Sequence, residues 1–126
     1  MVKYLVDTDV LIDFLRGNAK AKQFIKTNFD SIMLSTITIA ELYSGVREGE
    51  ERLNLDEFIE LVVVVPVTDE IAVKGGLFKR DYIKSHGTGF ADAIIAATSI
   101  VHKVTLCSLN KKHFPMVRDM KVPYKK

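Results

Sequence analysis

The stretch KYLVDTDVLIDFLRG, residues 3–17, decides the fold of this chain. Its apolar run Tyr4–Val6 stops at Asp7, and after Thr8 and Asp9 the apolar residues recur at helical spacing. This change of period predicts a strand, a tight turn and then a helix. Asp7 would therefore stand at the carboxyl end of a buried strand, which is where open parallel α/β sheets bind their ligands.

Length and composition agree with a globular domain. The chain has 126 residues, and we expect one domain over residues 1–126 with its own hydrophobic core. A net charge of +2 permits a nucleic-acid partner without requiring one. The single cysteine, Cys107, cannot form an internal disulfide. No apolar run is long enough to cross a membrane and the N-terminus lacks a signal-peptide pattern, so we expect a cytoplasmic protein.

Strand patterns alternate with helix patterns along the chain. After the first helix we expect a helix at 19–28, a strand at 31–35, helices at 36–47 and 48–62, a strand at 61–65, a helix at 70–85, a buried helix at 90–101, a strand at 104–108 and a possible edge strand at 121–124. The valine run at 61–65 indicates a strand covered on both faces. The alternation predicts an α/β fold with a central, mostly parallel sheet flanked by helices.

Three acids stand in apolar surroundings at the ends of these elements. Asp7 ends the first strand, Glu41 lies early in the helix after the second strand, and Asp92 opens the buried helix. If the strands are parallel, all three acids meet at one edge of the sheet. Clustered carboxylates repel one another and are stabilised by sharing protons or by a divalent cation. Oxygen ligands without a His or Cys pattern favour Mg²⁺, with Mn²⁺ as a substitute.

Each acid also has a structural interpretation. Asp7 and Asp92 could cap the helices that follow them. Thr38 and Glu41 have the spacing of a capping box, in which the glutamate bonds back to the amide of the capping residue. For Asp9, in the opening turns of the first helix, a favourable interaction with the helix dipole is the preferred interpretation. The same applies to Asp13, which could also pair with Arg16.

Four motifs in succession resemble one known family. They are VDTDVLIDFLRG at 6–17, STITIAEL at 35–42, ADAIIAA at 91–97 and TLCSLNKKHF at 105–114. Together they are similar to the PIN-domain family, in particular to the VapC-type toxin ribonucleases of type II toxin–antitoxin systems. The resemblance covers residues 2 to about 114. It implies a single compact PIN-like α/β domain and a metal-dependent endoribonuclease that hydrolyses RNA phosphodiester bonds with Mg²⁺.

The resemblance also implies roles for particular residues. Asp7 and Asp92 would hold the metal most directly, and Glu41 would complete the acidic cluster. A fourth acid of the family falls near position 110 or three residues later, where this chain has Asn110 and His113. We expect Asn110 to take part in the site through hydrogen bonds to water or phosphate. His113 before Phe114 is interpreted as structural, although it could bind metal or phosphate.

Substrate and partners follow from the same resemblance. Lys111, Lys112 and Arg16 are the best candidates for holding the RNA backbone. Toxins of this kind are usually held inactive by a cognate antitoxin whose segment enters the active-site groove, and they usually form homodimers. We expect no membrane partner.

Three alternatives use the same residues differently. A PIN-domain nuclease could mature RNA without acting as a toxin. The pattern from Asp7 to Leu11 also matches a haloacid-dehalogenase-like phosphatase, with Asp7 as nucleophile and Asp9 as acid/base, but a late acidic pair and a clear partner lysine are missing. A non-catalytic Mg²⁺-binding regulatory module would need a lysine after the last strand, where Ser108 to Asn110 stand.

Overall fold

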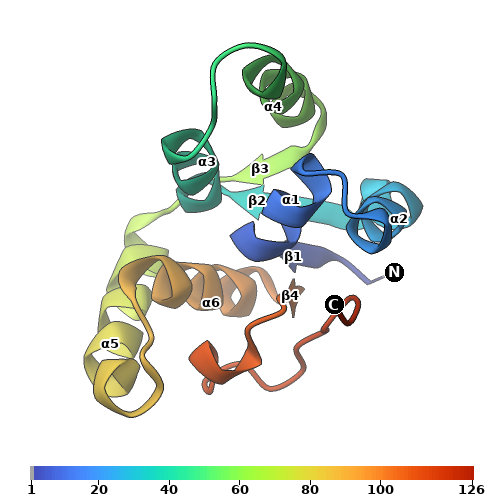
Figure 1. Ribbon diagram of the computed structural model, residues 1–126. Coiled ribbons are helices and arrows are strands. Elements are labelled where there is room, and N and C mark those ends of the chain that lie inside the picture. Colours follow the sequence, from blue (N-terminus) through green and yellow to red (C-terminus); the bar gives the residue numbers. More distant parts are fainter. Residues whose placement is uncertain (1) are drawn as a thin grey trace.

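Four parallel strands form one sheet in the computed structural model, which describes residues 2–126. They are β1 (Tyr4–Val6), β2 (Ile32–Ser35), β3 (Val63–Val65) and β4 (Thr105–Cys107), and their order across the sheet is β3-β2-β1-β4 (Figure 1). Each neighbouring pair is parallel. The carboxyl ends of all four strands therefore lie at one edge of the sheet, as the sequence predicts.

Helices connect the strands. They are α1 (Thr8–Leu15), α2 (Ala19–Asn28), α3 (Thr36–Ser44), α4 (Glu50–Leu61), α5 (Asp69–His86) and α6 (Phe90–His102), with 3₁₀ turns η1 (Phe29–Ser31) and η2 (Lys111–His113). Side-chain caps on backbone amides fix where helices start: the Asn18 side chain accepts from Ala21 N, and the Thr68 side chain accepts from Ile71 N. The two helices expected at 36–47 and 48–62 are separate elements, and Gly49, the residue before α4, has a φ of 107°.

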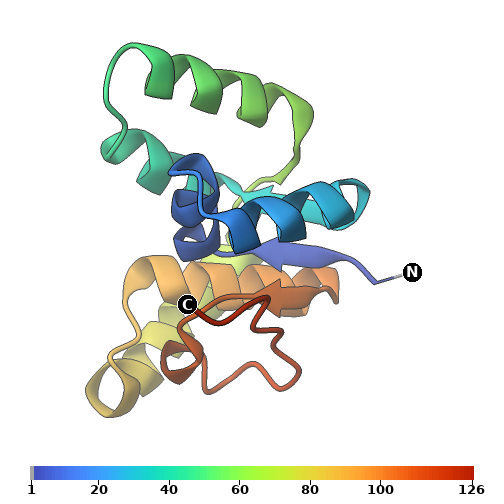
Figure 2. The ribbon, with the colours of Figure 1, turned by 45° about the vertical axis from the view of Figure 1, so that its right-hand side comes forward.

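The sheet is covered on both faces (Figure 2). Helices α1 to α4 lie on one side and α5 and α6 on the other. Side chains alternate accordingly, because successive residues of a strand point to opposite faces: Val6 and Cys107 pack in the core under α1 and α2, whereas Leu5 and Leu106 pack against α6. Both faces of β1 and β4 are thus buried, which makes the start of α1 a rigid place for a functional side chain.

The predicted two-sided burial of the valine run is wrong. Val63 is 59% exposed and Leu61, at the end of α4, is 72% exposed. The reason is the strand order: β3 is an edge strand of the sheet, so it has one neighbour only, β2. A continuous valine run is typical of a buried parallel strand, but it does not reveal which strand stands at the edge.

Helix α6 is buried through most of its length, as expected, but not at its two ends. Its middle packs closely against α5 because α5 has a glycine there: a Cβ on Gly75 would lie 2.8 Å from Ile94 Cδ1 and 3.2 Å from Ile94 Cα. Phe90, the first residue of α6, is 65% exposed, and Ile100 near the other end is 37% exposed. The prediction of a buried helix is therefore wrong for Phe90.

The C-terminal segment forms a single bridge instead of the possible edge strand at 121–124. Lys121 pairs in parallel with Cys107. The chain then runs to α1, where the Tyr124 hydroxyl donates to Asp13 Oδ2 over 2.7 Å and Lys126 Nζ lies 3.0 Å from Asp13 Oδ1. Asp13 thus pairs with the C-terminal segment, and the pairing with Arg16 that the helical spacing suggests is not among the ion pairs of residues 2–126.

The helices can be compared with the requirements for crossing a membrane. Within residues 2–126, none of them combines the length and the apolar character that a membrane crossing requires.

Candidate active site

Asp7 stands where the sequence places it, directly after β1. Its backbone N–H donates to Cys107 O over 2.9 Å and continues the pairing of β1 with β4. Its carboxylate caps α1, because Oδ1 accepts from Thr8 N over 2.8 Å. The residue is only 6% exposed. The capping interpretation is therefore correct for one oxygen of this carboxylate and leaves Oδ2 for other contacts.

Ser108 connects Asp7 with a second acid, Asp9. The Ser108 hydroxyl lies 2.7 Å from Asp7 Oδ2 and 3.3 Å from Asp9 Oδ2. Asp9 Oδ2 also accepts from Leu109 N over 3.0 Å, while its Oδ1 accepts from Val10 N over 2.7 Å. Asp9 thus lies in the first turn of α1, where the helix dipole favours an acid, and also lies in the acidic cluster.

The environment of Asp7 disfavours its charge. Burial, followed by the negative charge of Asp9, raises the pKa of Asp7 from 3.8 to about 7, and Asp92 adds to the rise. The hydrogen bonds from Ser108 and Thr8 act in the opposite direction. Burial likewise raises the pKa of Asp9. A buried carboxylate beside like charges is a place where a cation would be strongly stabilising.

Glu41 reaches the same edge from α3. Its Oε1 accepts a hydrogen bond from the Thr8 hydroxyl over 2.6 Å, although the two residues are 33 positions apart. The capping-box interpretation is wrong, because Ser35 caps α3 by accepting from Ile37 N over 3.2 Å. Thr38, the expected cap, is fully buried, and its hydroxyl has no hydrogen-bond partner within residues 2–126.

Asp92 lies in the first turn of α6 and pairs with His113. The two atoms, Asp92 Oδ2 and His113 Nδ1, are 3.1 Å apart, and both side chains are about one-quarter exposed. The Asn110 amide nitrogen lies 3.1 Å from the same His113 Nδ1. Thr88, which is fully buried, fixes η2 beside α6 by donating to His113 O over 2.8 Å. Asn110 therefore contacts the site indirectly, through His113. Within residues 2–126 it makes no hydrogen bond to an acidic side chain.

Sequence reasoning missed Ser108 and undervalued Asp9. Ser108 directly follows the apolar strand β4, just as Asp7 follows β1, and Ser35 is the last residue of β2. A polar residue at the carboxyl end of each of these three parallel strands is the signal that could have identified Ser108.

Comparison with known proteins settles the family. The family model described as "PIN domain" matches residues 4–118. The chain belongs to the PIN-domain family. It is 40% identical to Ribonuclease VapC19 of Mycobacterium tuberculosis over 124 residues, which cover 95% of this chain and 98% of that protein. It is 37% identical to Ribonuclease VapC10 of the same organism over 123 residues, covering 95% and 92% of the two chains.

The fold also matches a solved structure. A toxin–antitoxin complex from Klebsiella pneumoniae superposes with a TM-score of 0.82 at 24% identity, covering 98% of this chain and all of that chain. This likeness confirms the α/β fold expected from the sequence. The family assignment also favours a nuclease over the phosphatase and the regulatory module.

The predicted RNA-binding cations lie near different acids of the candidate site. Lys111 and Lys112 are exposed on η2, directly before the His113 that contacts Asp92. Arg16 caps the carboxyl end of α1, and it lines a cavity of about 70 Å³ together with Glu41 and Glu51. Arg16 is therefore near the Glu41 side of the site, and the two lysines are near the Asp92 side.

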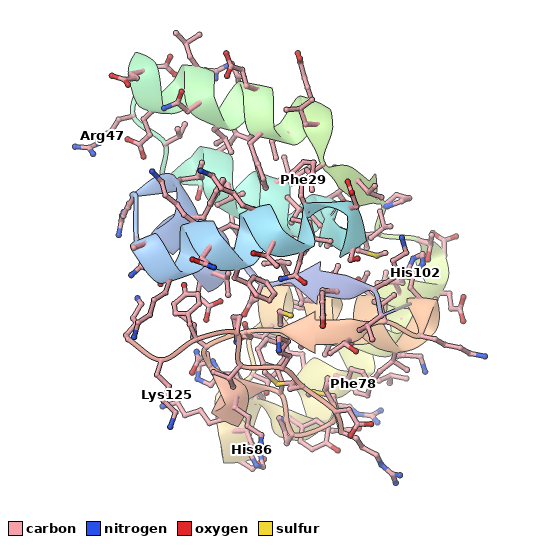
Figure 3. The ribbon with its side chains drawn as sticks, turned by 90° about the vertical axis from the view of Figure 1, so that its right-hand side faces the viewer. Phe29, Arg47, Phe78, His86, His102 and Lys125 are labelled. Atoms are coloured by element: carbon pink, nitrogen blue, oxygen red, sulfur yellow. The ribbon has the colours of Figure 1, made fainter. Side chains whose placement is uncertain are left out.

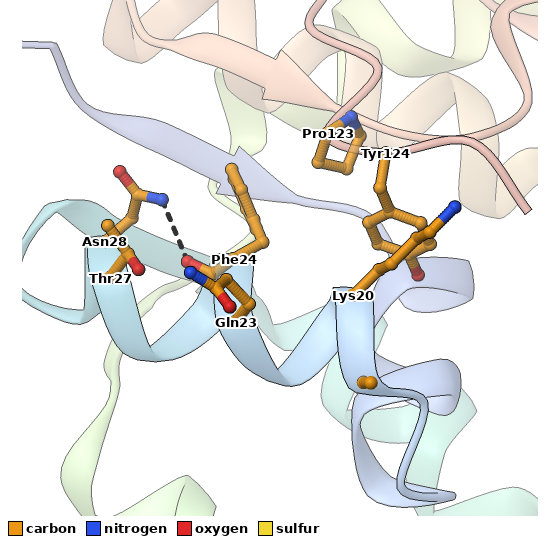
Figure 4. Close-up of a pocket in the computed structure, with 8 residues that line it drawn as sticks. Lys20, Gln23, Phe24, Thr27, Asn28, Pro123 and Tyr124 are labelled. Carbon is orange, nitrogen blue, oxygen red and sulfur yellow. Dashed lines mark hydrogen bonds between the residues drawn. The ribbon is translucent and has the colours of Figure 1, made fainter.

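Two larger hollows lie outside the acidic cluster. One, of about 550 Å³, separates Arg16 and Leu15 from the start of α4, and Arg47 points outward there (Figure 3). The other, also about 550 Å³, lies between α2 and the C-terminal segment (Figure 4), where Phe24, Tyr124 and Lys20 line it. The lining of the second hollow contains no acid, histidine or cysteine, so it offers no group for the chemistry of the acidic cluster.

The oxygen atoms of these acids are suitable ligands for a divalent cation, but the acids do not yet surround a common point. Nucleases of this family are metal-dependent in general. The donor set consists of carboxylate oxygens, which hard cations prefer. Within residues 2–126, however, no three His, Cys, Asp or Glu side chains already surround a common point. Each acid instead has a different hydrogen-bond partner: Ser108 for Asp7, Thr8 for Glu41 and His113 for Asp92.

Proposed function

We propose that this protein is a metal-dependent endoribonuclease that acts as the toxin of a VapBC-type toxin–antitoxin pair. The observation that carries the proposal is the convergence of Asp7, Glu41 and Asp92 at one edge of the sheet, in a chain whose relatives along nearly its whole length are named ribonucleases. The reaction is hydrolysis of an RNA phosphodiester bond.

Mg²⁺, or Mn²⁺ in its place, is the proposed cofactor. Asp7 and Asp92 would hold it most directly, and Glu41 would complete the set. When bound, such a cation supplies an activated water and neutralises charge on the phosphate. The Ser108 hydroxyl and Thr8 keep the carboxylates of Asp7 and Glu41 oriented while the substrate enters.

The chain's own cations would place the substrate. Lys111 and Lys112 stand beside Asp92 and can contact phosphates on either side of the cleaved bond. Arg16 can contact the backbone beyond Glu41. Single-stranded or looped RNA is the expected form, because the cleaved backbone must reach a buried carboxylate. Asn110 orients His113 and can bond water or phosphate.

A cognate antitoxin is the proposed protein partner. The solved neighbour described above is itself a toxin–antitoxin complex. The hollow between α1 and α4 shares Leu15, Arg16 and Glu51 with the cavity at Glu41, so a partner segment seated there would approach the Glu41 side of the site. A homodimer, as the family resemblance implies, and a cytoplasmic location, where an RNA-cleaving toxin would meet its substrate, complete the proposal.

A nuclease that matures RNA without harming the cell is the second candidate. It would use the same acids and the same cations, so the site does not distinguish it from a toxin. Expression in cells separates the two: a toxin arrests growth unless its antitoxin is present, and a maturation enzyme does not.

Cleavage of a total RNA pool tests the enzymatic proposal. Wild type should give discrete cuts with Mg²⁺ or Mn²⁺, and these cuts should vanish in chelator and in Asp7→Asn or Glu41→Gln. The matched controls Asp30→Asn and Glu57→Gln change acids on η1 and α4, away from the cluster, and should cut like wild type. Cleavage that survives in Asp7→Asn at an undiminished rate would refute the assignment of the site.

A further inference from the structure

Phe90 is an exposed aromatic ring beside the acidic cluster. It is the first residue of α6, two positions before Asp92, and it is 65% exposed. The Lys79 ammonium, from α5, lies 4.6 Å from the centroid of its ring, which is a cation–π contact. Exposing a phenylalanine is unfavourable by the hydrophobic effect, and the Lys79 contact leaves most of this ring in water.

One cation contacts Phe90, and two more lie on the other side of Asp92. Lys79 covers one part of the ring, and Lys111 and Lys112 stand beyond Asp92 on η2. Gly89 precedes the helix without a side-chain cap, so the amides of the first turn of α6 keep their capacity to donate. An exposed aromatic ring with a cation over it, close to a nuclease site that has further cations, is the combination that binds single-stranded nucleic acid.

We propose that Phe90, with Lys79 over its ring, forms a stacking subsite for a nucleobase that flanks the cleaved bond of single-stranded RNA. The inference rests on the proposed function and deepens it. Residues two apart on a helix do not face each other, so Phe90 points to the side of α6 away from Asp92. Both residues lie in the first turn of α6, so the ring stands within one helical turn of Asp92. There it can hold a base that flanks the phosphate at Asp7 and Asp92.

A nucleobase explains the exposure better than a second protein chain does. The exposed large apolar residues on α5 are Val73, Leu77 and Ile83. Leu77 is two residues from Lys79, and Val73 shares its face, so both lie on the opposite side of α5 from the Lys79–Phe90 contact. Ile83, four residues after Lys79, shares its face but is only 37% exposed. The apolar surface around Phe90 is thus small and bordered by charge, whereas a protein interface is expected to contain a contiguous apolar core.

A tryptophan reporter tests the stacking directly, because the chain contains no tryptophan. Phe90→Trp in the Asp7→Asn background, with chelator present, is titrated with a ten-nucleotide oligoadenylate. Stacking should quench the fluorescence of the tryptophan. The same oligonucleotide with abasic positions, which has equal length and charge, should not quench it. Ile100→Trp is the matched control, since it lies on the same helix about 15 Å farther along and should not respond to either RNA.

Binding constants supply the second measurement. In the same background, Phe90→Leu keeps an apolar side chain without a π face, and it should weaken oligoadenylate binding by roughly 5- to 150-fold, as expected for loss of one stacked base. Phe90→Tyr should bind like the parent. Equal affinity of the Leu and Tyr variants would overturn the inference.

Further outcomes separate this inference from the proposed function. If wild type cuts RNA but the fluorescence of the Phe90→Trp protein ignores oligoadenylate, the stacking subsite is refuted and the nuclease stands. If wild type cuts no RNA, the proposed function fails first, and the subsite fails with it. If the fluorescence of the Phe90→Trp protein instead follows protein concentration, and Phe90→Leu shifts the sedimentation coefficient, then Phe90 belongs to an interface between two copies and the inference is overturned.

Discussion

Replacement of Asp7 by asparagine should make the folded protein more stable above pH 7, although it removes the central residue of the proposed site. The asparagine side chain would have nearly the same volume and could still accept from Thr8 N. It would carry no charge beside Asp9 and Asp92, which together with burial raise the pKa of Asp7. The gain should therefore come from removing a buried charge and should depend on pH.

The magnitude follows from the pKa. The pKa of Asp7 rises from 3.8 to about 7. At about 1.4 kcal/mol per pKa unit, folding therefore disfavours the ionised form of this carboxylate by about 4 kcal/mol. Asparagine accepts one of the two hydrogen bonds that Asp7 accepts, and losing the other costs about 1 kcal/mol. The free energy of unfolding of Asp7→Asn should thus exceed that of wild type by about 3 kcal/mol at pH 8.

The sign of the pH dependence is fixed by which state binds the proton. Between about pH 4 and pH 7, folded Asp7 keeps a proton that the unfolded chain releases. The stability of wild type relative to Asp7→Asn therefore falls as the pH rises through this range. Near pH 4 the two proteins should differ by about 1 kcal/mol or less, and above pH 7 the difference should stay constant.

Urea unfolding in chelator at a series of pH values from 4 to 8.5 measures this difference. Chelator is needed because a bound cation would stabilise ionised Asp7 and mask the effect. Asp30→Asn, which removes an exposed acid, is the control and should follow wild type at every pH. An Asp7→Asn protein that is less stable than wild type at pH 8 would show that burial does not penalise this carboxylate, and the electrostatic argument would be wrong.

Three further outcomes are expected. Saturating Mn²⁺ should raise the melting temperature of wild type and leave that of Asp7→Asn unchanged; equal shifts in both proteins would place the cation elsewhere. Replacing Lys111 and Lys112 together with alanine should reduce the slope of log affinity against log salt by about 1.4, as expected for two phosphate contacts with a single strand, and an unchanged slope would remove them from the RNA path. Tyr124→Phe should lower the free energy of unfolding by about 1–2 kcal/mol, because it removes the 2.7 Å hydrogen bond to Asp13; an unchanged urea midpoint would show that the C-terminal segment contributes nothing there.

Local patterns in the sequence were sufficient for the framework of the site. The switch from strand to helix period at Asp7, and the parallel sheet implied by alternating elements, place Asp7 and Asp92 at one edge without any knowledge of contacts. The same reasoning brought Glu41 to that edge. Each of these residues lies within one turn or two of a strand end or a helix start, so its position follows from the boundaries of its own element.

Contacts between distant segments could not be predicted in this way. Ser108 bonds to Asp7 across 101 positions, and Leu109 N bonds to Asp9 across 100. These bonds depend on β4 lying next to β1, which is a property of the strand order. The same strand order leaves Val63 exposed on β3, although its sequence is typical of a buried strand. Strand order depends on how whole elements pack together, so it cannot be predicted from a short stretch of sequence.

The hydrogen bonds of the acids explain why the site can be unfavourable for folding and still be kept. Asp7, Glu41 and Asp92 each accept or share a hydrogen bond with a different residue: Ser108, Thr8 or His113. These hydrogen bonds stabilise each carboxylate in its own position. They do not offset the cost of burying a charge at Asp7, whose pKa remains raised. A protein tolerates a destabilising site when the rest of its fold is stable enough. Here the hydrophobic cores on the two faces of β1 supply that stability and offset the buried charge of Asp7. Changes in those cores should therefore reduce stability, whereas neutralising Asp7 should increase it and abolish cleavage.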